Sequence, residues 1–307
     1  MKQNQRLIIN ILTLLIILVG GLGISNLLVK YFSRENGSPL VQDTFLLTKE
    51  EIISEGEESA EEVFRDNGEP DGEAVKEDSI SSDEEKDFVP KIAFIIDDLG
   101  YERQIAQEII ELDFPVALSI LPYLTHSEYL AEEGKKNSQE IILHLPLEAH
   151  NSDADPGPGA IKSYMSEEEI REAVRKALSA VPYILGVNNH MGSKITENRA
   201  MMEIILEEIG RYNLFFIDSL TSENSIAYKI AQEMGIKTAA RSVFLDNEND
   251  LDYIKGQMEE AQRIAFKKGE AIVIGHSRIN TFYALKRMVP ELIKAGIEVV
   301  PVSELVR

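Results

Sequence analysis

Short apolar runs alternate with amphipathic segments along the last two-thirds of the chain. Each run is no longer than eight residues and is rich in Ile, Val or Phe, which is typical of strands buried on both faces. The predicted strands span residues 91–97, 115–121, 140–146, 184–189, 214–219, 237–244, 270–276 and 297–303. Seven or eight repeats of strand and helix indicate an α/β fold with a parallel sheet, because parallel neighbours need crossover connections.

The segments between these runs have the spacing of helices that pack on a sheet. In the segment 166–180, Ser166 is followed three residues later by Glu169, which is the pattern of a capping box. One apolar stripe runs along this predicted helix and consists of Ile170, Val174, Ala177 and Leu178. We therefore expect helices of this kind to cover the sheet.

An open doubly wound sheet and a closed barrel share this alternation. A barrel draws its polar site from the carboxyl ends of several strands, whereas an open sheet concentrates the site near one switch point. Here polar side chains follow six of the predicted strands. They are Asp97 and Asp98, His144 and Glu148, Asn188 to His190, Asp218, Asp246, and His276. This spread favours a barrel.

A nearly unbroken apolar segment lies near the N-terminus, at residues 7–29. At 1.5 Å per residue, about 22 residues cover the roughly 30 Å hydrocarbon core of a bilayer. We find no A-x-A cleavage pattern, so we expect a transmembrane signal anchor over residues 1–32 rather than the cleaved leader of a secreted protein. Lys2 and Arg6 favour a cytoplasmic N-terminus. The remainder of a single-pass bacterial membrane protein would then lie outside the cell.

Residues 33–89 are predicted to form a disordered acidic linker. Between residues 50 and 87 the chain has 17 acidic and three basic residues. Such a stretch cannot bury enough apolar surface to fold, although an acidic interaction tail is an alternative. At Pro90 the sequence changes from runs of charged residues to short apolar runs, and we expect one folded domain over residues 90–307.

The composition of the chain excludes several classes of partner and of catalytic site. The formal net charge is −22, and the absence of a basic stripe argues against a nucleic-acid partner. The chain has no cysteine, which excludes disulfides, thiolate metal sites and cysteine nucleophiles. The sequence also lacks a G-x-S-x-G motif and a P-loop. Hydrolysis would therefore depend on water and on a metal held by His, Asp or Glu.

The first candidate residues are Asp97 and Asp98, which end an otherwise apolar strand. Adjacent strand residues point to opposite faces, so one carboxylate can reach a metal while its neighbour contacts water or a ligand. The alternative is that Asp98 caps the following helix. Two charges at the end of a buried strand need stabilising partners, and this favours the functional interpretation.

Four more candidates lie at or just after strand ends. His144 and Glu148 flank Pro146, where a strand gives way to a loop, and imidazole with carboxylate suits zinc or another divalent cation. His190 lies between glycines, which allow close approach of the backbone, although a tight turn with a solvent-facing imidazole is the alternative. His276 follows an apolar run, where an imidazole is placed to act as general acid or base.

Six motifs together resemble a known family. IIDDLG, ALSILP, ILHLPLE, GVNNHMGS, FFIDSLT and VIGHSR, in this order, are similar to the divergent polysaccharide deacetylases, a branch of the NodB-type carbohydrate esterases. The resemblance covers residues 90–307. It implies a distorted (β/α)7 barrel that removes an N- or O-linked acyl group from a glycan, using a divalent metal, usually Zn²⁺.

Position by position, the resemblance implies a general base at Asp97, a metal ligand at Asp98 and a general acid at His276. His144 matches the first histidine of the wider family's paired-histidine motif.

The second histidine of that motif is absent, and its place is nearest Glu148. His190 has no counterpart, and we expect it to replace the missing ligand. The expected metal set is therefore Asp98, His144, His190 and Glu148.

The leading hypothesis is a metal-dependent hydrolase that removes acyl groups, with acetyl foremost, from a cell-wall or extracellular polysaccharide. The alternative is a catalytically inactive barrel that binds glycan or assists assembly of the cell envelope. Metal content and acetate release separate the two hypotheses.

Overall fold

The computed structural model describes residues 88–307. The signal anchor expected over residues 1–32, and all but the last two residues of the expected linker, lie outside this part of the chain. Within residues 88–307, none of the helices combines the length and the apolar character that crossing a membrane requires.

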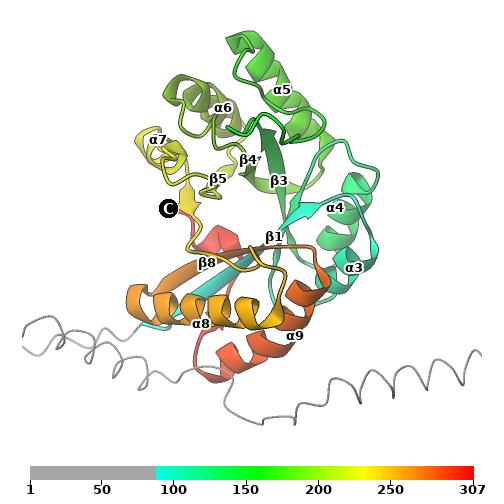
Figure 1. Cartoon of the computed structure of the whole chain (residues 1–307), viewed down its shortest axis with the longest axis vertical. Coiled ribbons are helices and arrows are strands. Elements are labelled where there is room, and N and C mark those ends of the chain that lie inside the picture. The colour runs from blue at the N-terminus through cyan, green and yellow to red at the C-terminus, as the bar shows by residue number, and fades with distance from the viewer. Residues whose placement is uncertain (1–87) are drawn as a thin grey trace, which may run out of the picture. The chain divides into compact units, whose positions relative to one another are not determined.

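A parallel sheet forms the centre of the domain (Figure 1). In the described part of the chain it has nine strands: β1 (Lys91–Leu99), β2 (Ala117–Ile120), β3 (Glu140–Leu147), β4 (Ile184–Met191), β5 (Phe215–Asp218), β6 (Thr238–Ala240), β7 (Val243–Phe244), β8 (Glu270–His276) and β9 (Glu298–Val299). The spatial order is β6-β5-β4-β3-β2-β1-β8-β7, and β9 also pairs with β1. The predicted α/β class with a parallel sheet is confirmed.

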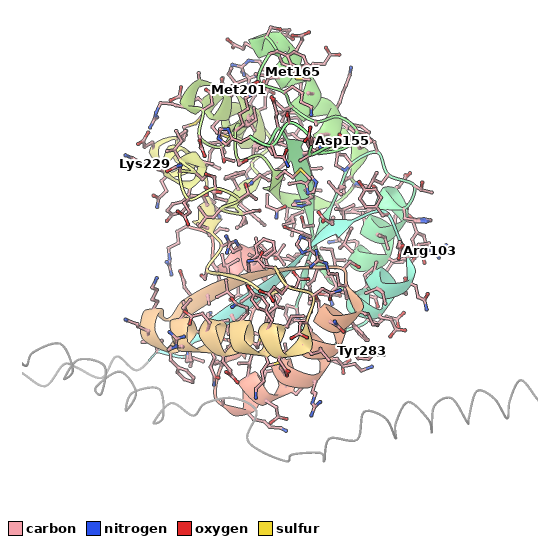
Figure 2. The ribbon with its side chains drawn as sticks, viewed as in Figure 1. Arg103, Asp155, Met165, Met201, Lys229 and Tyr283 are labelled. Carbon is pink, nitrogen blue, oxygen red and sulfur yellow. The ribbon has the colours of Figure 1, made fainter. Side chains whose placement is uncertain are left out.

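The helices surround this sheet on the outside (Figure 1). They are α3 (Gln104–Ile110), α4 (Ser127–Lys136), α5 (Glu167–Ala180), α6 (Arg199–Arg211), α7 (Ala227–Glu233), α8 (Leu251–Lys268) and α9 (Ile279–Lys294). The capping box predicted at Ser166 and Glu169 is present at the start of α5, and the predicted apolar stripe is buried. Figure 2 shows Arg103, Lys229 and Tyr283 on the outer surface of this helical layer.

The sheet is curled into a half-barrel. Its two edge strands, β6 and β7, are separated in the chain only by Arg241 and Ser242. Three Cα–Cα steps from Ala240 to Val243 span at most about 11 Å, so the edges approach each other. Arg241 N donates to Asp218 O in β5, and Ser242 N donates to Ile272 O in β8. The chain thus passes from one edge of the sheet to the other.

Two strand predictions are corrected by this arrangement. The predicted strand at 237–244 is two short strands at opposite edges, because the chain changes partner between Ala240 and Val243. The predicted strand at 297–303 is reduced to β9, and a 3₁₀ helix, Val302–Glu304, follows it. Pro301 precedes this helix and has no N–H to continue a ladder.

Both faces of the sheet are apolar, which explains the unbroken hydrophobic runs. The inner cluster contains residues of the strands and of the C-terminal segment, and no residue of helices α3–α9. Its strand residues include Ala93, Ile95, Ala117, Ile142, Ile217, Ile272 and Ile274. The outer cluster joins alternate strand residues, such as Ile92 and Phe94, to the helices. Side chains alternate along a strand with a period of two, so each strand feeds both clusters.

Candidate metal centre and acid–base site

The candidate residues occupy the next inward-facing positions beyond the inner apolar cluster. Six polar residues each lie two positions after an inward-facing strand residue. They are Asp97, Ser119, His144, Asn188, Ser219 and His276, which follow Ile95, Ala117, Ile142, Gly186, Ile217 and Ile274 in that order. His190 lies two residues beyond Asn188. Register pairs Asp97 with His276, and His144 with Asn188, across neighbouring strands. The two-residue period of the sheet therefore assembles a polar layer on top of an apolar one.

Asp98 reaches the same layer through an irregularity in β1. A regular strand would point Asp98 away from Asp97, but its φ is +61°, in the left-handed region. The register between β1 and β2 shifts between Ile96 and Leu99, as in a β-bulge. The bulge turns the second carboxylate inward, so both aspartates face the site. Asp98 does not cap a helix, because α3 begins only at Gln104.

Three side chains form a candidate metal centre. Asp98 Oδ1 lies 3.2 Å from His144 Nε2 and 3.0 Å from His190 Nδ1. The two histidine nitrogens are 3.2 Å apart. Ligands about 2.0 to 2.1 Å from a tetrahedral ion are about 3.3 Å from one another, so these spacings suit one small cation.

The donor set also fits a cation chemically. Asp98 Oδ1 is buried and has no hydrogen-bond donor of adequate geometry. An unpaired buried carboxylate oxygen is costly unless a metal or a charged group meets it. In the described residues, Asp98, His144 and His190 are the group of metal-ligating side chains close enough to share one ion. Imidazole and carboxylate ligands suit Zn²⁺ among divalent cations.

Asn188 connects the candidate ligands to the candidate base. Its amide nitrogen donates to Asp97 Oδ1 at 2.8 Å and to Ser219 Oγ at 3.2 Å. Its amide oxygen accepts from Ser119 Oγ at 2.7 Å and lies 2.9 Å from His144 Nδ1. A carboxylate can only accept, so Asp97 fixes which end of the amide faces it.

This orientation has a consequence for His144. Because the amide oxygen of Asn188 faces Nδ1, that nitrogen must carry a proton, and Nε2 is the atom left for a metal. A second hydrogen bond of this kind commonly fixes the tautomer and the ring orientation of a metal-binding histidine.

Electrostatics in the cluster favour a bound cation. Burial alone would raise the pKa of Asp98, but contacts with the imidazoles of His144 and His190, and their charges, hold that pKa far below its usual value. Burial alone would lower the pKa of His144, yet the charge of Asp97 and the contact with Asp98 raise it. Both shifts favour an ionised Asp98 beside the two imidazoles, and a cation would compete with protons for the same nitrogen atoms.

His276 stands at the edge of the centre with a carboxylate behind it. Its Nδ1 lies 2.9 Å from Asp246 Oδ1, and its Nε2 lies 3.6 Å from Asp98 Oδ2. Thr281 Oγ1 donates to the other Asp246 oxygen at 2.6 Å. Burial would lower the pKa of His276, but the hydrogen bond and charge of Asp246, with smaller contributions from Asp98 and Asp97, raise it. Its protonated form is thereby favoured.

Glu148 has another place in the structure. Its carboxylate accepts from Lys194 Nζ at 2.8 Å and from Ser163 N at 2.5 Å, and these bonds lower its pKa to about 2. It lies outside the three-residue group, so the expectation that it joins the ligands is corrected. The physical reason is that Glu148 follows the end of β3 and links the β3–α5 connection, at Ser163, to the segment after β4, at Lys194.

Some strand-end residues can be recognised in the sequence without their roles, and others cannot. Asp218 faces outward and holds the β5–α7 connection through Ser225 Oγ and Tyr228 N. The sequence marks Asn188 and Asp246 only as polar strand-end residues, and it does not single out Ser119 and Ser219. The signal that could have found Ser119, Asn188 and Ser219 is the two-residue step from the inner apolar positions.

Comparison with known proteins shows which family this chain matches. The family model for divergent polysaccharide deacetylases matches residues 94–306. The uncharacterized protein YibQ of Escherichia coli (strain K12) is 35% identical over 202 residues, which make up 66% of this chain and 63% of YibQ. The matched region therefore spans less than two thirds of that relative's length.

Two further relatives extend the comparison. An uncharacterized protein of Haemophilus influenzae (strain ATCC 51907 / DSM 11121 / KW20 / Rd) is 32% identical over 204 residues, or 66% of this chain and 72% of that protein. The crystal structure of the uncharacterized protein ATU2773 from Agrobacterium tumefaciens C58 superposes with a TM-score of 0.68 at 24% identity. This match covers 71% of this chain and 90% of that chain and shows a shared fold.

Proposed function

The chain belongs to the divergent polysaccharide deacetylase family, and on that premise we propose that it is a metal-dependent hydrolase. Its proposed reaction removes an acyl group, with acetyl as the first to test, from a cell-wall or extracellular polysaccharide. The amide or ester bond between the acyl carbon and the sugar breaks, and water supplies the hydroxyl of the released acid and the proton of the sugar product.

One observation carries this proposal: three ligand atoms from β1, β3 and β4 lie within 3.2 Å of one another. They belong to Asp98, His144 and His190, and a buried carboxylate and an imidazole adjoin them. These five side chains come from four different strands, which matches the requirement that a hydrolytic metal centre hold its ligands and leave one side open.

Asp98, His144 and His190 would hold the cation, for which Zn²⁺ is the proposed identity. A divalent cation supplies Lewis-acid polarisation of the acyl carbonyl and of a water molecule when it is bound. The chain's own residues then have to position the groups that react and move protons between them.

Asp97 is the proposed base. Its side chain is 4% exposed, and Asn188 holds its Oδ1, which leaves Oδ2 3.6 Å from His144 Nε2. That oxygen can accept the proton of an attacking water next to the ligands.

His276 is the proposed acid. Asp246 holds Nδ1 and favours the protonated ring, and Nε2 lies 3.6 Å from Asp98 Oδ2. From there it can donate a proton to the sugar nitrogen or oxygen that leaves.

The proposed location is outside a bacterial membrane. This part of the proposal is supported by sequence alone: the apolar segment 7–29 as a single-pass anchor over residues 1–32, and the acidic residues 33–89 as a tether that holds the domain at residues 90–307 away from the membrane. Polysaccharide in the cell envelope would then be within reach.

The proposal is tested by metal content and product release. The purified full chain should bind one equivalent of zinc and release acetate from N-acetylated or O-acetylated glycan fragments. His144→Ala should lose both properties, whereas His150→Ala should keep them, because His150 is exposed and pairs with Glu197. A wild-type protein that binds oligosaccharide in the presence of chelator but releases no acetate would instead be a glycan-binding barrel.

A further inference from the structure

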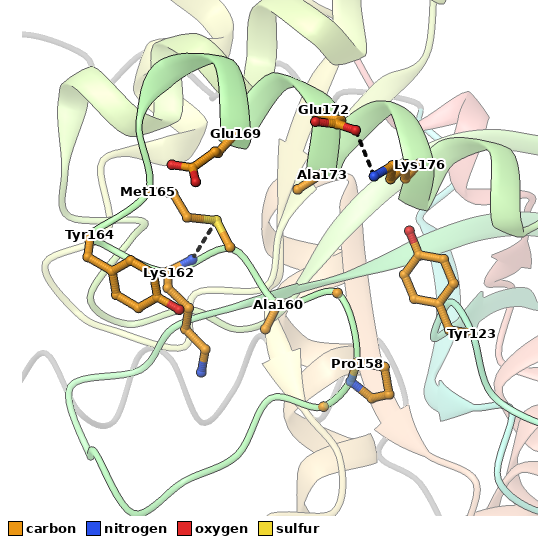
Figure 3. Close-up of a pocket in the computed structure, with 12 residues that line it drawn as sticks. Tyr123, Pro158, Ala160, Lys162, Tyr164, Met165, Glu169, Glu172, Ala173 and Lys176 are labelled. Atoms are coloured by element: carbon orange, nitrogen blue, oxygen red, sulfur yellow. Dashed lines mark hydrogen bonds and ion pairs between the residues drawn. The ribbon is translucent and has the colours of Figure 1, made fainter.

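A groove of about 640 Å³ lies on the rim of the domain (Figure 3). The β2–α4 connection, the β3–α5 connection and the adjacent face of α5 form its walls. Its lining includes Tyr123, Gly159, Lys162, Tyr164, Glu172 and Lys176. The volume falls within the range of about 300 to 1,000 Å³ that is usual for small-molecule sites.

The groove adjoins the mouth of the half-barrel. Its β3–α5 segment, which carries the labelled Asp155 and Met165 in Figure 2, is fastened to the end of β3 by the bond from Ser163 N to Glu148. Glu148 lies four residues after His144. On the other side, a Cβ placed on Gly157 would lie 3.7 Å from the hydroxyl of Tyr101, which is three residues after Asp98. The segments that follow β1 and β3, which carry Asp98 and His144, therefore also contact the loop that lines the groove.

Two exposed tyrosines border the groove. Tyr123 and Tyr164 lie on opposite sides of it in Figure 3, and they are 44% and 83% exposed. Tyr123 has a φ of +64°, and a Cβ on Gly159 would lie 2.3 Å from its ring. A left-handed backbone is unfavourable for a residue with a Cβ. A closely packed, strained backbone thus presents an aromatic ring to solvent, and strain of this kind is enriched at ligand sites.

The charges of the groove suit a neutral, hydroxyl-rich ligand. Lys162 and Lys176 are balanced by Glu169 and Glu172, and Lys176 pairs with Glu172 at 2.7 Å. A phosphate site would need an excess of positive charge. A pyranose has one apolar face of C–H groups, which packs on an aromatic ring, and hydroxyls that bond to polar neighbours. Tyrosine rings with lysine and glutamate heads between them provide both.

We propose that this groove binds a sugar unit of the polysaccharide several units away from the one at the metal centre. Tyr123 and Tyr164 pack against the faces of the sugar rings, and Lys162 and Glu172 meet the hydroxyls. The inference rests on the proposed function because it assigns the groove to the same polysaccharide. It makes the enzyme selective for chains over short fragments.

Binding to the chelator-treated full chain tests the groove without turnover. Calorimetric titration uses N-acetylglucosamine hexamer and dimer as probes. We expect Tyr123→Ala and Tyr164→Ala each to weaken hexamer binding about tenfold and to leave dimer binding within twofold of wild type. The matched control is Tyr183→Ala, because Tyr183 has a φ of +65° and is 54% exposed, yet it precedes β4 at the opposite end of the sheet. Thermal melting verifies that each variant is folded.

The outcomes separate the groove from the catalytic proposal. Hexamer binding that is absent in wild type, unchanged in both groove variants, or equally weakened in Tyr183→Ala overturns the groove assignment. Acetate release by the zinc-loaded protein is measured independently. If release is absent but hexamer binding depends on Tyr123 and Tyr164, the groove assignment stands and the proposed hydrolysis fails.

Discussion

Replacing Asn188 by alanine tests how the site is organised. Asn188 is fully buried, and its side chain contacts both Asp97, the proposed base, and His144, a proposed metal ligand. The substitution removes an amide that fills four hydrogen-bonding roles, two of them to Ser119 and Ser219. It changes no group that would bind the metal, so its effect on metal affinity must act through orientation.

The magnitude follows from those four contacts. The bond to ionised Asp97 is worth about 1.5 to 3 kcal/mol, and each partner left unpaired in a buried site costs about 1 to 3 kcal/mol. The contributions are not additive, since water can enter the space, and we expect the free energy of unfolding to fall by about 3 to 5 kcal/mol. Loss of a partner that orients a metal ligand typically weakens metal binding by about 10 to 100-fold.

The assays measure both quantities on the full chain. Chemical denaturation gives the free energy of unfolding, and competition with a chromophoric chelator gives the zinc affinity. The chain has five histidines, so nitrogen-resolved NMR of ¹⁵N-labelled histidine can follow the proton on His144 Nδ1 in the zinc-bound state. Ser219→Ala is the matched control, because it removes only the 3.2 Å bond to Asn188. It should cost about 0.5 to 1.5 kcal/mol and leave zinc affinity within threefold.

A clear result would refute the reasoning. If folded Asn188→Ala binds zinc within threefold of wild type, with His144 Nδ1 still protonated, then Asn188 does not orient the ligand. An equal loss of zinc affinity in Ser219→Ala would likewise show that general loosening of the buried layer, rather than the amide of Asn188, controls binding.

Two further predictions follow from the described residues. Asp246→Asn removes a charge that raises the pKa of His276, so that pKa should fall. The proposed role of His276 requires its acid form, and the alkaline limb of kcat/KM should therefore move to lower pH by about one unit. An unmoved limb in the pH–rate profile would contradict the acid role of His276. Gly159→Ala would place a Cβ 2.3 Å from Tyr123, and chemical denaturation should show it about 1 to 3 kcal/mol less stable than Gly235→Ala, which has a similar positive φ and no atom within 4 Å. Equal destabilisation of the two variants would mean that the Gly159–Tyr123 contact is not tight.

Much of the fold could be predicted from the sequence because it rests on local signals. Apolar runs of strand length and the capping box at Ser166 predicted a parallel sheet with covering helices, and these are present. The split of the predicted strand 237–244 could not be predicted, since it depends on where the curled edges meet. The same limit applies to Asp98, because a left-handed residue other than glycine leaves no mark in the sequence.

The residues of the candidate site could be predicted from the sequence better than the hydrogen bonds that those residues make. Strand-end position singled out Asp98, His144 and His190, which the structure brings together. Glu148 has the same sequence character, but its partners Ser163 and Lys194 lie 15 and 46 residues away, and only the folded loop shows that they engage it. Long-range hydrogen bonds of this kind are set by tertiary packing.

X-ray absorption of the zinc-loaded full chain tests the central claim most directly. The account predicts one zinc with two imidazole nitrogens and one carboxylate oxygen at about 2.0 to 2.2 Å, and loss of one imidazole in His190→Ala. A protein that takes up no zinc, or whose zinc environment is unchanged by His190→Ala, would contradict a metal centre formed by Asp98, His144 and His190.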